Sequence, residues 1–581
     1  MDNRAIADVL VEIAELLEVK GEVVFKTRAY HRAAQAIASW PESLARTAAS
    51  GRLEQIPGVG KAISEKVETL LNTGTLPFHE KLKAEFPEGM LSLMAVPGVG
   101  PKTAYRISKE LDVHSPEELE AAARAGQLRT LSGMGEKREE AILHSLALLR
   151  RKDSRRPIAE VLPIVRDLQD MLEDIGAAEQ LTAAGSVRRF EETIGDVDFI
   201  GTSRDPQRFM DAFVALPVVQ DVLGHGSTKS SVITVQGLQV DVRLVEPQNY
   251  GNLLQHFTGS RQHNINLREY AQRIGLSISE YGMTEAATGV VHTCTTEEDV
   301  YRILKLPYLP PELRQGLDEI ERALRGQLPR LIEDADILGD VHAHTDWSDG
   351  RHTLDDMANA GEKRGWQYMC ITDHSAGRAV AGGLQPERLQ QQIALIRAYR
   401  PARPDFHLLA GIEVDIRADG SLDCPDELLE QLDFVVASIH SAMQQDEATM
   451  TARIIRAMES PHVDTIGHLT GRLVGHREPI ALNIGAIMDA ASRTGTALEI
   501  NGSMERLDMK DSYVRMANER SITLSMGTDA HAISSLDNLT YSVLIARRGW
   551  TEAKNVLNTW PADRLLTWMR TPKAERSTMA R

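Results

Sequence analysis

The stretch GSVRRFEETIGDVDFI (185–200) carries two aspartates, Asp196 and Asp198, in a run that ends in apolar residues. Alternate residues of a β-strand point to the same face, so a strand here would present both carboxylates together. A third carboxylate, Asp241, alternates in the same way within QVDVRLV (239–245). If the two strands pair, the three carboxylates converge and form a site for two divalent cations, as in-line phosphoryl transfer requires. Oxygen ligands favour Mg²⁺ or Mn²⁺ at such a site.

The residues just upstream of these aspartates are suited to a phosphate. Gly185 and Ser186 offer a turn and a hydroxyl, and Arg188 and Arg189 offer two cations. An isolated Asp-x-Asp is more often a solvated strand edge than a metal site. The basic turn before it and the later strand aspartate favour the metal site.

Upstream, the chain repeats one pattern three times, as LEQIPGVGKAISEKVETLL (53–71), LMAVPGVGPKTAYRISKEL (93–111) and LRTLSGMGEKREEAILHSL (128–146). Each copy leads from apolar residues through Gly-x-Gly into a predicted helix. A helix that begins at such a turn exposes backbone N–H groups, which bind nucleic acid phosphates without reading bases. Close helix packing is the alternative, and it explains one copy better than three. The copies resemble the helix-hairpin-helix motifs of DNA repair proteins, with the hairpin glycines at Gly58, Gly60, Gly98, Gly100, Gly133 and Gly135.

Downstream, DVHAHTDWSDG (340–350) opens a second group of candidate ligands. His342 and His344 alternate on a strand, so both rings share a face, and Asp349 follows in a loop. Six further candidates lie at or just after the ends of five later predicted strands, where α/β barrels gather their catalytic groups. Nine His, Asp and Glu ligands without cysteine suit two or three clustered Zn²⁺, Mn²⁺ or Fe²⁺ ions. A lone buried histidine is usually structural, but nine such residues favour a metal centre. They are His342, His344, Asp349, His374, Glu413, His440, His468, Asp529 and His531.

Composition excludes several classes of protein. The 581 residues contain no apolar run long enough to span a membrane, and the acidic N-terminus does not resemble a secretory signal. Three cysteines, none in a Cys-x-x-Cys pair, cannot build a disulfide framework and fit a reducing cytosol. The net charge of −18 argues against a protein that coats nucleic acid through bulk positive charge. Residues 1–150 hold 19 Lys and Arg against 21 Asp and Glu, so this region is nearly neutral and the rest of the chain is acidic.

Periodicity divides the chain into three regions. Residues 1–150 show the spacing of short amphipathic helices, and the basic segment 150–157 is expected to be a linker without helix. In the middle region we expect strands over 197–200, 232–235 and 239–245, and helices over 253–274 and 317–324. From residue 337, strands are expected over 367–371, 408–412, 434–438, 465–467, 497–500 and 523–526. Strands that alternate with helices in this way favour an α/β barrel.

The middle region resembles the catalytic core of X-family DNA polymerases, through GSVRRFEETIGDVDFI, VDVRLV and HFTGSRQHNINLR (256–268). This resemblance implies an α+β nucleotidyltransferase palm and thumb, with Asp196, Asp198 and Asp241 as catalytic metal ligands. It places Gly185, Ser186, Arg189 and Gly195 at the triphosphate, Phe257, Thr258 and Gly259 along the sugar, and Asn264 and Arg268 near the nascent pair and template. Two departures are His256, where animal members usually have Tyr, and Phe190, where they often have Gly.

The same resemblance extends to the N-terminal region. It places Lys66 at the Schiff-base lysine of the deoxyribose-phosphate lyase found in the family, and Lys26 and Tyr30 at the DNA-binding pocket around it. Ala62 replaces a basic residue that animal members commonly use on the 5′-phosphate. A surface lysine on a DNA-facing helix is an equally good interpretation of Lys66.

The histidine-rich region resembles the PHP phosphoesterase domain, named for polymerases and histidinol phosphatases, and all nine family ligand positions are filled. An X-family core followed by a PHP domain is the architecture of bacterial X-family polymerases. The resemblance therefore implies a multidomain chain with an α-helical N-terminal helix-hairpin-helix region, an α+β palm and thumb, and a distorted (β/α)7-type PHP barrel. The expected domains are a lyase-like domain (1–80), a region with two further hairpins (81–150), the palm (151–250), the thumb (251–312), a linker helix (313–336) and the PHP domain (337–575).

We therefore expect a DNA polymerase that fills short gaps in DNA repair, joined to a phosphoesterase acting as a 3′–5′ exonuclease, a 3′-phosphatase or an abasic-site endonuclease. The expected partners are gapped or nicked DNA and dNTPs, without a membrane, for a monomer in the bacterial cytoplasm near the nucleoid. The alternative is a PHP nuclease whose polymerase core only grips DNA ends. A scaffold with two idle sites fits two complete ligand sets poorly.

Overall fold

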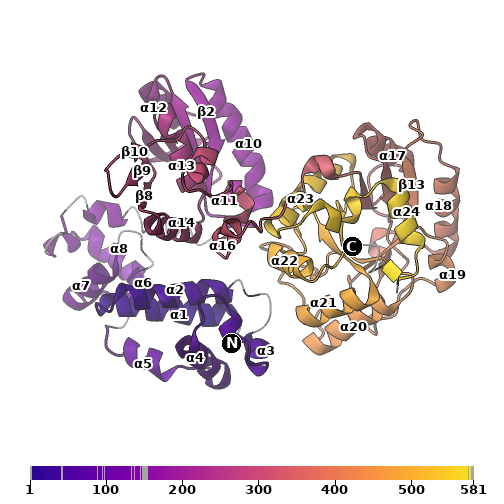
Figure 1. The fold of residues 1–581 in the computed structure, drawn as a ribbon, viewed down its shortest axis with the longest axis horizontal. Helices are drawn as coiled ribbons and strands as arrows, with labels where there is room; N and C mark the ends of the chain where they lie inside the picture. The colour runs from indigo at the N-terminus through magenta and orange to yellow at the C-terminus, as the bar shows by residue number, and fades with distance from the viewer. Residues whose placement is uncertain are drawn as a thin grey trace. The chain divides into compact units, whose positions relative to one another are not determined.

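The computed structural model divides the chain into two compact units, residues 1–155 and 156–581. It describes residues 3–38, 40, 44–87, 89–94, 96, 99–131, 134–135, 138–143, 146, 155–573 and 575–576. Figure 1 shows the helices of the first unit in indigo to purple and the second unit from magenta to yellow. No helix among the described residues is long and apolar enough to cross a membrane.

The first unit is helical, as its periodicity predicts. Its apolar positions face inward and form one core that includes Leu10, Ile13, Ala33, Val67 and Ile107. The helices are α1 (Asn3–Val19), α2 (Val24–Ala38), α3 (Leu44–Ala49), α4 (Lys61–Thr73), α5 (Pro77–Lys83), α6 (Met90–Met94), α7 (Pro101–Leu111) and α8 (Pro116–Arg124).

The repeated hairpins fold as the glycine pattern predicts. Helix α4 begins directly after Gly60, helix α7 directly after Gly100, and a helical segment follows Gly135 from residue 138. Gly58 has a φ of +83°, a conformation that glycine adopts without strain, and a Cβ there would lie 3.3 Å from Arg32. Gly98 and Gly133 lie outside the described residues.

The second unit begins with a five-stranded sheet in the order β2-β4-β7-β6-β5. Its strands are β2 (Ala178–Ala183), β4 (Asp196–Ser203), β5 (Val219–His225), β6 (Lys229–Thr234) and β7 (Gln239–Leu244). The core contains apolar residues of this sheet together with those of α10 (Ile158–Asp174) and α12 (Pro206–Val214). In β7 the buried residues Val240, Val242 and Leu244 alternate with Gln239, Asp241 and Arg243, so the period-2 pattern fixes which face carries the carboxylate.

Two local segments differ in detail from the expectation. Of the expected linker 150–157 the structure describes residues 155–157, which end in strand β1 (Arg156–Pro157), paired with β3 (Thr193–Ile194). The expected helix 253–274 is two helices, α13 (Tyr250–Thr258) and α14 (Arg261–Arg273). Gly259 separates them with a φ of +62°, which no α-helix contains, and the hydroxyl of Ser260 caps α14 by accepting from the His263 N–H.

A smaller subdomain follows the palm sheet. It contains α14, the antiparallel strands β8 (Leu276–Ser279), β9 (Gly282–Glu285) and β10 (Val291–His292), helix α15 (Glu297–Ile303) and a core around Tyr301 and Leu309. The side chain of Arg314 is buried in this subdomain, and its Nη1 donates to Glu297 Oε1 at 2.6 Å. Helix α16 (Glu319–Leu324) then leads toward the C-terminal domain, within the predicted 313–336 segment.

The C-terminal domain is a nearly closed parallel barrel. Seven strands pair in chain order, and a bridge joins Ala343, the last residue of the first strand, to Ala530, which lies just after the last strand. The strands are β11 (Gly339–Ala343), β12 (Tyr368–Ile371), β13 (His407–Asp415), β14 (Phe434–Ser438), β15 (Thr465–Ile466), β16 (Ala497–Asn501) and β17 (Leu524–Gly527). All six strand predictions in this domain are confirmed within a few residues of each end.

Helices surround these strands (Figure 1). They are α17 (Leu354–Lys363), α18 (Pro386–Ala398), α19 (Asp426–Leu429), α20 (Glu447–Glu459), α21 (Ile484–Thr494), α22 (Asp511–Glu519), α23 (Leu539–Arg548) and α24 (Ala562–Arg570). Six of the seven strands, all except β13, are buried along their whole length, which explains their continuous apolar character.

Candidate active sites

The three palm carboxylates come from two strands that pair in parallel. Asp198 on β4 lies opposite Asp241 on β7, and Asp196 lies opposite Gln239. The side-chain amide of Gln239 donates to both oxygens of Asp241, at 3.4 and 3.3 Å. Burial, together with the charges of Asp196 and Asp241, raises the pKa of Asp198 to about 7. Three carboxylates held on one face and mutually repulsive in this way are a donor set that a divalent cation stabilises.

The basic turn before β4 packs against these carboxylates. Its residues form the short helix α11 (Gly185–Arg188), which begins with Gly185 at a φ of +61°. A Cβ at Gly185 would lie 3.0 Å from Asp198 Oδ2, so glycine is needed there for both conformation and space. Ser186 follows Gly185 in α11, and Gly195 lies between β3 and β4. Both residues are half-buried.

The turn also contacts the segment expected to line the sugar. Arg188 Nη1 donates to Thr258 Oγ1 at 2.6 Å, and Arg189 Nη1 donates to the carbonyl oxygen of Thr258. The guanidinium of Arg243 lies over the ring of Phe257, 4.5 Å from its centroid. Gly259 follows directly, where a Cβ would lie 3.3 Å from Arg189 Nη1. The structure therefore brings the predicted triphosphate and sugar residues together.

Two further predicted contacts converge on His256 at the end of α13. Asn264 Nδ2 donates to the His256 carbonyl oxygen at 2.7 Å, and its Oδ1 accepts from Gln255 Nε2. Arg268 Nη2 lies 3.3 Å from His256 Nδ1. Burial lowers the pKa of His256, and the charge of Arg268 lowers it further. A neutral imidazole therefore lies at the end of α13.

All nine predicted ligands of the barrel lie close together. Three tight groups bring ligand atoms within 4.8 Å of one another, and within the described residues such groups occur only in this domain. They are His344, Asp349, His374 and His531; His342, His344 and Asp529; and His374, Glu413 and His440. The ninth residue, His468, places Nε2 2.9 Å from Glu413 Oε1.

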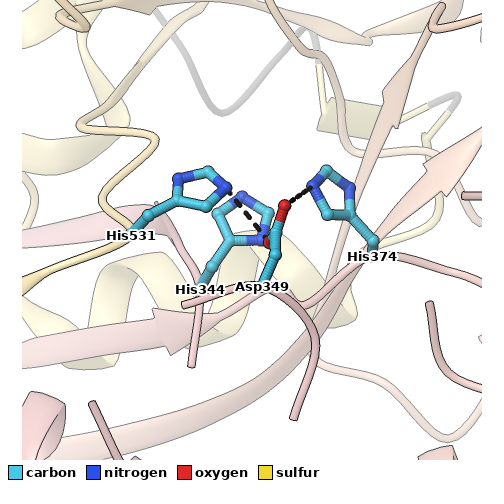
Figure 2. A group of neighbouring side chains, drawn as sticks. All are labelled: His344, Asp349, His374 and His531. Atoms are coloured by element: carbon cyan, nitrogen blue, oxygen red, sulfur yellow. Dashed lines mark ion pairs between the residues drawn. The ribbon is translucent and has the colours of Figure 1, made fainter. Parts of the chain in front are cut away.

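Figure 2 shows the first group, in which Asp349 reaches toward two histidines. An Asp349 oxygen lies 3.2 Å from His531 Nε2, and the other lies 3.6 Å from His374 Nε2. His344 stands between the rings of His374 and His531, at centroid distances of 4.5 and 4.3 Å. His344 and His374 each belong to two groups, so three neighbouring ion positions would share ligands.

The electrostatics of this cluster fit metal ions. Burial and the neighbouring His374 lower the pKa of His344 to about 3, so its imidazole is neutral and able to coordinate. Burial alone would raise the pKa of Glu413, but His440, His374 and His342 hold it well below its ordinary value. Nδ1 of His344 and Nε2 of His342 are buried without a hydrogen bond. Such orphaned atoms are costly unless they coordinate an ion.

Supporting residues of this cluster were not predicted from the sequence. Glu499 Oε1 lies 2.5 Å from His342 Nδ1, and its Oε2 accepts from the His468 N–H at 2.6 Å. Asp415 holds His440 Nδ1 at 2.9 Å, and Arg506 Nε donates to Asp529 Oδ2 at 3.1 Å. A signal existed for two of them, because Glu499 lies inside a predicted strand and Asp415 alternates with Glu413 in GIEVDI.

The N-terminal candidates lie on two helices of the first unit. Lys66, on α4, donates to the Ala62 carbonyl oxygen at 2.9 Å and lies 5.4 Å from the centre of the Phe78 ring. Tyr30, on α2, is buried, and exposed Lys26 lies 3.3 Å from Glu22. Within the described part of this unit, Lys66 makes its contacts with Ala62 and Phe78 and Lys26 pairs with Glu22, so the structure does not bring these candidates together.

Comparison with known proteins agrees with this arrangement. The family model of the DNA polymerase beta thumb matches residues 253–315, and that of the PHP domain matches residues 340–505. A helix-hairpin-helix domain matches residues 1–76, and a SAM-like helix-hairpin-helix tandem matches residues 90–147.

Full-length similarity is found with the DNA polymerase/3′-5′ exonuclease PolX of Bacillus subtilis (strain 168). The two chains are 38% identical over 560 residues, which cover 96% of this chain and 97% of the relative. A probable phosphatase of Thermoanaerobacter sp. (strain X514) is 28% identical over 239 residues, 38% of this chain and 89% of its own. A probable phosphatase of Shewanella sediminis (strain HAW-EB3) is 28% identical over 242 residues, 40% of this chain and 93% of its own. The chain therefore belongs to the X-family DNA polymerases that carry a C-terminal PHP domain.

Proposed function

We propose that the chain extends primer 3′ ends across short gaps in DNA with its palm, and hydrolyses phosphoesters at 3′ ends with its PHP barrel. The observation that supports the proposal is that one chain carries two groups of candidate ligands: three aspartates on two paired strands of the palm and nine clustered residues in the barrel. The full-length bacterial relative is named for both activities.

In the palm, Asp196, Asp198 and Asp241 would hold Mg²⁺ or Mn²⁺. Bound there, the cations would lower the pKa of the primer 3′-hydroxyl and neutralise charge on the triphosphate. Arg188 and Arg189 lie in the turn that begins at Gly185, and the missing side chain of Gly185 leaves room for this turn beside Asp198. Ser186, Gly195, Phe257, Thr258 and Gly259 would orient the nucleotide, with Asn264 and Arg268 on the side of the nascent pair. The reaction joins the nucleotide to the 3′ end and releases pyrophosphate.

In the barrel, the nine ligands would hold two or three Zn²⁺, Mn²⁺ or Fe²⁺ ions. Such ions activate water and clamp a phosphoester. Glu499 and Asp415 fix the orientation of His342 and His440, and Arg506 fixes Asp529. The proposed reaction is 3′–5′ exonuclease cleavage, with a 3′-phosphatase or abasic-site endonuclease reaction at the same centre, because each breaks a phosphoester near a DNA end.

The proposed substrates are gapped or nicked DNA and dNTPs. The helix-hairpin-helix repeats would hold the DNA backbone through helix N-termini at Gly60, Gly100 and Gly135. We further propose a monomer in the bacterial cytoplasm, close to the nucleoid, that takes part in base excision and break repair. A deoxyribose-phosphate lyase reaction at Lys66 is a separate proposal, tested by borohydride trapping of a DNA adduct in the unmodified chain and in Lys66→Ala.

One assay tests both main activities. An end-labelled primer on gapped DNA is incubated with Mn²⁺, with and without dNTPs. We expect the primer to lengthen with dNTPs and to shorten without them. Asp198→Ala should abolish lengthening and leave shortening intact, and His344→Ala should do the reverse. Shortening alone in the unmodified chain would instead favour a nuclease whose polymerase core grips DNA ends.

A further inference from the structure

The segment that follows the basic turn is held by the C-terminal domain. Four consecutive palm residues, 189–192, each contact a PHP-domain side chain, although more than 275 residues separate the partners in the chain. Because Arg189 is the predicted triphosphate contact and begins this segment, the contacts reach directly into the proposed nucleotide site.

Arg548, the last residue of α23, makes two of the four contacts. Its Nη1 donates to the Arg189 carbonyl oxygen at 2.6 Å, and its Nη2 lies 3.3 Å from Glu191 Oε2. The guanidinium is almost fully buried and is itself held by Asp511 at 2.6 Å. Arg548 therefore has a fixed position from which it orients the main chain of Arg189.

Tyr541, two turns earlier on α23, makes the third contact. Its ring stacks on that of Phe190, with centroids 5.8 Å apart and planes within 6° of each other. Phe190 is buried and has a φ of +53°, a left-handed conformation that costs free energy in a bulky residue. Related animal chains often have Gly at this position, which adopts that conformation freely. Here the stacked ring of Tyr541 stabilises Phe190 in the left-handed conformation.

Arg472 makes the fourth contact. Its two terminal nitrogens bind the two oxygens of Glu192 at 2.6 and 3.1 Å, a bidentate pair that fixes direction as well as distance. Its Nε donates to the Arg506 carbonyl oxygen at 3.0 Å. The Glu192 carbonyl oxygen in turn accepts from the Ile158 N–H at 2.9 Å, so the segment is fixed on both sides.

We propose that Tyr541, Arg548 and Arg472 are positioning residues for the polymerase reaction, through which the PHP domain fixes the triphosphate-binding turn. The inference rests on the proposed polymerase function. Arg189 links the PHP domain to the nucleotide site. Its main-chain carbonyl oxygen accepts from Arg548, and its side chain donates to Thr258 in the segment expected to line the sugar. Release of the segment therefore weakens nucleotide binding without removing a residue that we propose to contact the nucleotide.

The test is single-turnover filling of a one-nucleotide gap by the full chain, across a range of dNTP concentrations. Tyr541→Leu should raise the apparent dNTP dissociation constant about fivefold to tenfold, with the maximal rate within about twofold of the unmodified chain. Tyr541→Phe keeps the stacked ring and loses only the exposed hydrogen bond from Arg166 Nη2 to the Tyr541 hydroxyl, so it should behave like the unmodified chain. Glu192→Gln, which weakens the pair with Arg472 at a partly exposed position, should raise the constant about threefold.

A double-mutant cycle separates positioning from general packing. In the Phe190→Gly background the segment no longer needs the stack, so Tyr541→Leu should have no further effect on dNTP affinity. The 3′–5′ exonuclease rate reports whether the barrel is folded, and it should stay unchanged in each variant. Unchanged dNTP affinity in Tyr541→Leu, beside normal extension by the unmodified chain, would overturn this inference alone. Absence of extension by the unmodified chain would overturn the proposed polymerase function and this inference with it.

Discussion

Asp198 on β4 lies directly opposite Asp241 on the parallel neighbour β7, so two acidic side chains share one face of the palm sheet. Burial and the adjacent carboxylates raise the pKa of Asp198 to about 7, which measures how strongly the folded chain disfavours this concentration of negative charge. The arrangement costs stability in the absence of cations, and cation binding removes that cost.

The first prediction concerns the opposite effects of Asp241 on the stability of the metal-free chain and on primer extension. Asp241→Asn should abolish primer extension and should stabilise the metal-free protein by about 1 kcal/mol, because it removes a like charge from the cluster. Thermal unfolding in EDTA measures the gain. Addition of Mg²⁺ should raise the melting temperature of the unmodified chain more than that of the variant. A variant that is less stable than the unmodified chain in EDTA would contradict the interpretation.

The second prediction concerns the space beside Asp198. Gly185→Ala introduces a Cβ at 3.0 Å from Asp198 Oδ2 and at a φ of +61°, so we expect extension to fall by about 100-fold with the exonuclease unchanged. Gly224→Ala on β5 is the matched control, because its Cβ would meet nothing within 4 Å. Equal extension rates in the two variants would show that the close approach at Gly185 is unimportant.

The third prediction concerns Glu499, which binds His342 and the main chain of His468. Glu499→Gln should weaken metal binding by the barrel by about 10- to 100-fold, because it loses the charge that orients and polarises His342. Metal content after dialysis and the exonuclease rate should fall together, while primer extension continues. Glu430→Gln, at an exposed position, is the control. Full metal content in Glu499→Gln would refute a supporting role.

The fourth prediction concerns the buried ion pairs of the thumb. Glu297 binds Arg314 at 2.6 Å and Arg188 at 2.7 Å. Burial opposes ionisation, but Arg314 and Arg188 hold the pKa of Glu297 below its ordinary value. Glu297→Gln should destabilise the thumb by about 3 kcal/mol at pH 7, because Arg314 is left buried without its counter-ion.

The pH dependence of that effect follows from the direction of the shift. Because the pKa of Glu297 is lower in the folded chain, its stabilisation is present above the unfolded pKa of 4.5 and is lost as pH falls through the folded value. The difference between Glu297→Gln and the unmodified chain should therefore shrink below pH 4.5. Hydrogen exchange of the α15 amides at pH 7 and at pH 4 measures it, and a difference that grows on acidification would contradict the assignment.

The sequence by itself predicted which acidic and histidine side chains lie together, and it predicted most strands. Asp196, Asp198 and Asp241 were identifiable because strand alternation is a local property, and the nine barrel ligands because strand ends recur at regular intervals. The same local logic predicted helices after Gly60 and Gly100. Roles assigned to individual residues, including Lys66 and Asn264, stay predictions.

The tertiary structure alone decided the rest. Arg156 and Pro157 form a strand because Thr193 and Ile194 lie beside them, and α13 ends at Gly259 because of one main-chain conformation. No local sequence pattern predicts that Phe190 stacks on Tyr541, which lies 351 positions later in the chain. The same is true of the contact between Glu499 and His342. Periodicity reports how a residue faces its own strand or helix, whereas contacts between distant segments depend on how whole elements pack.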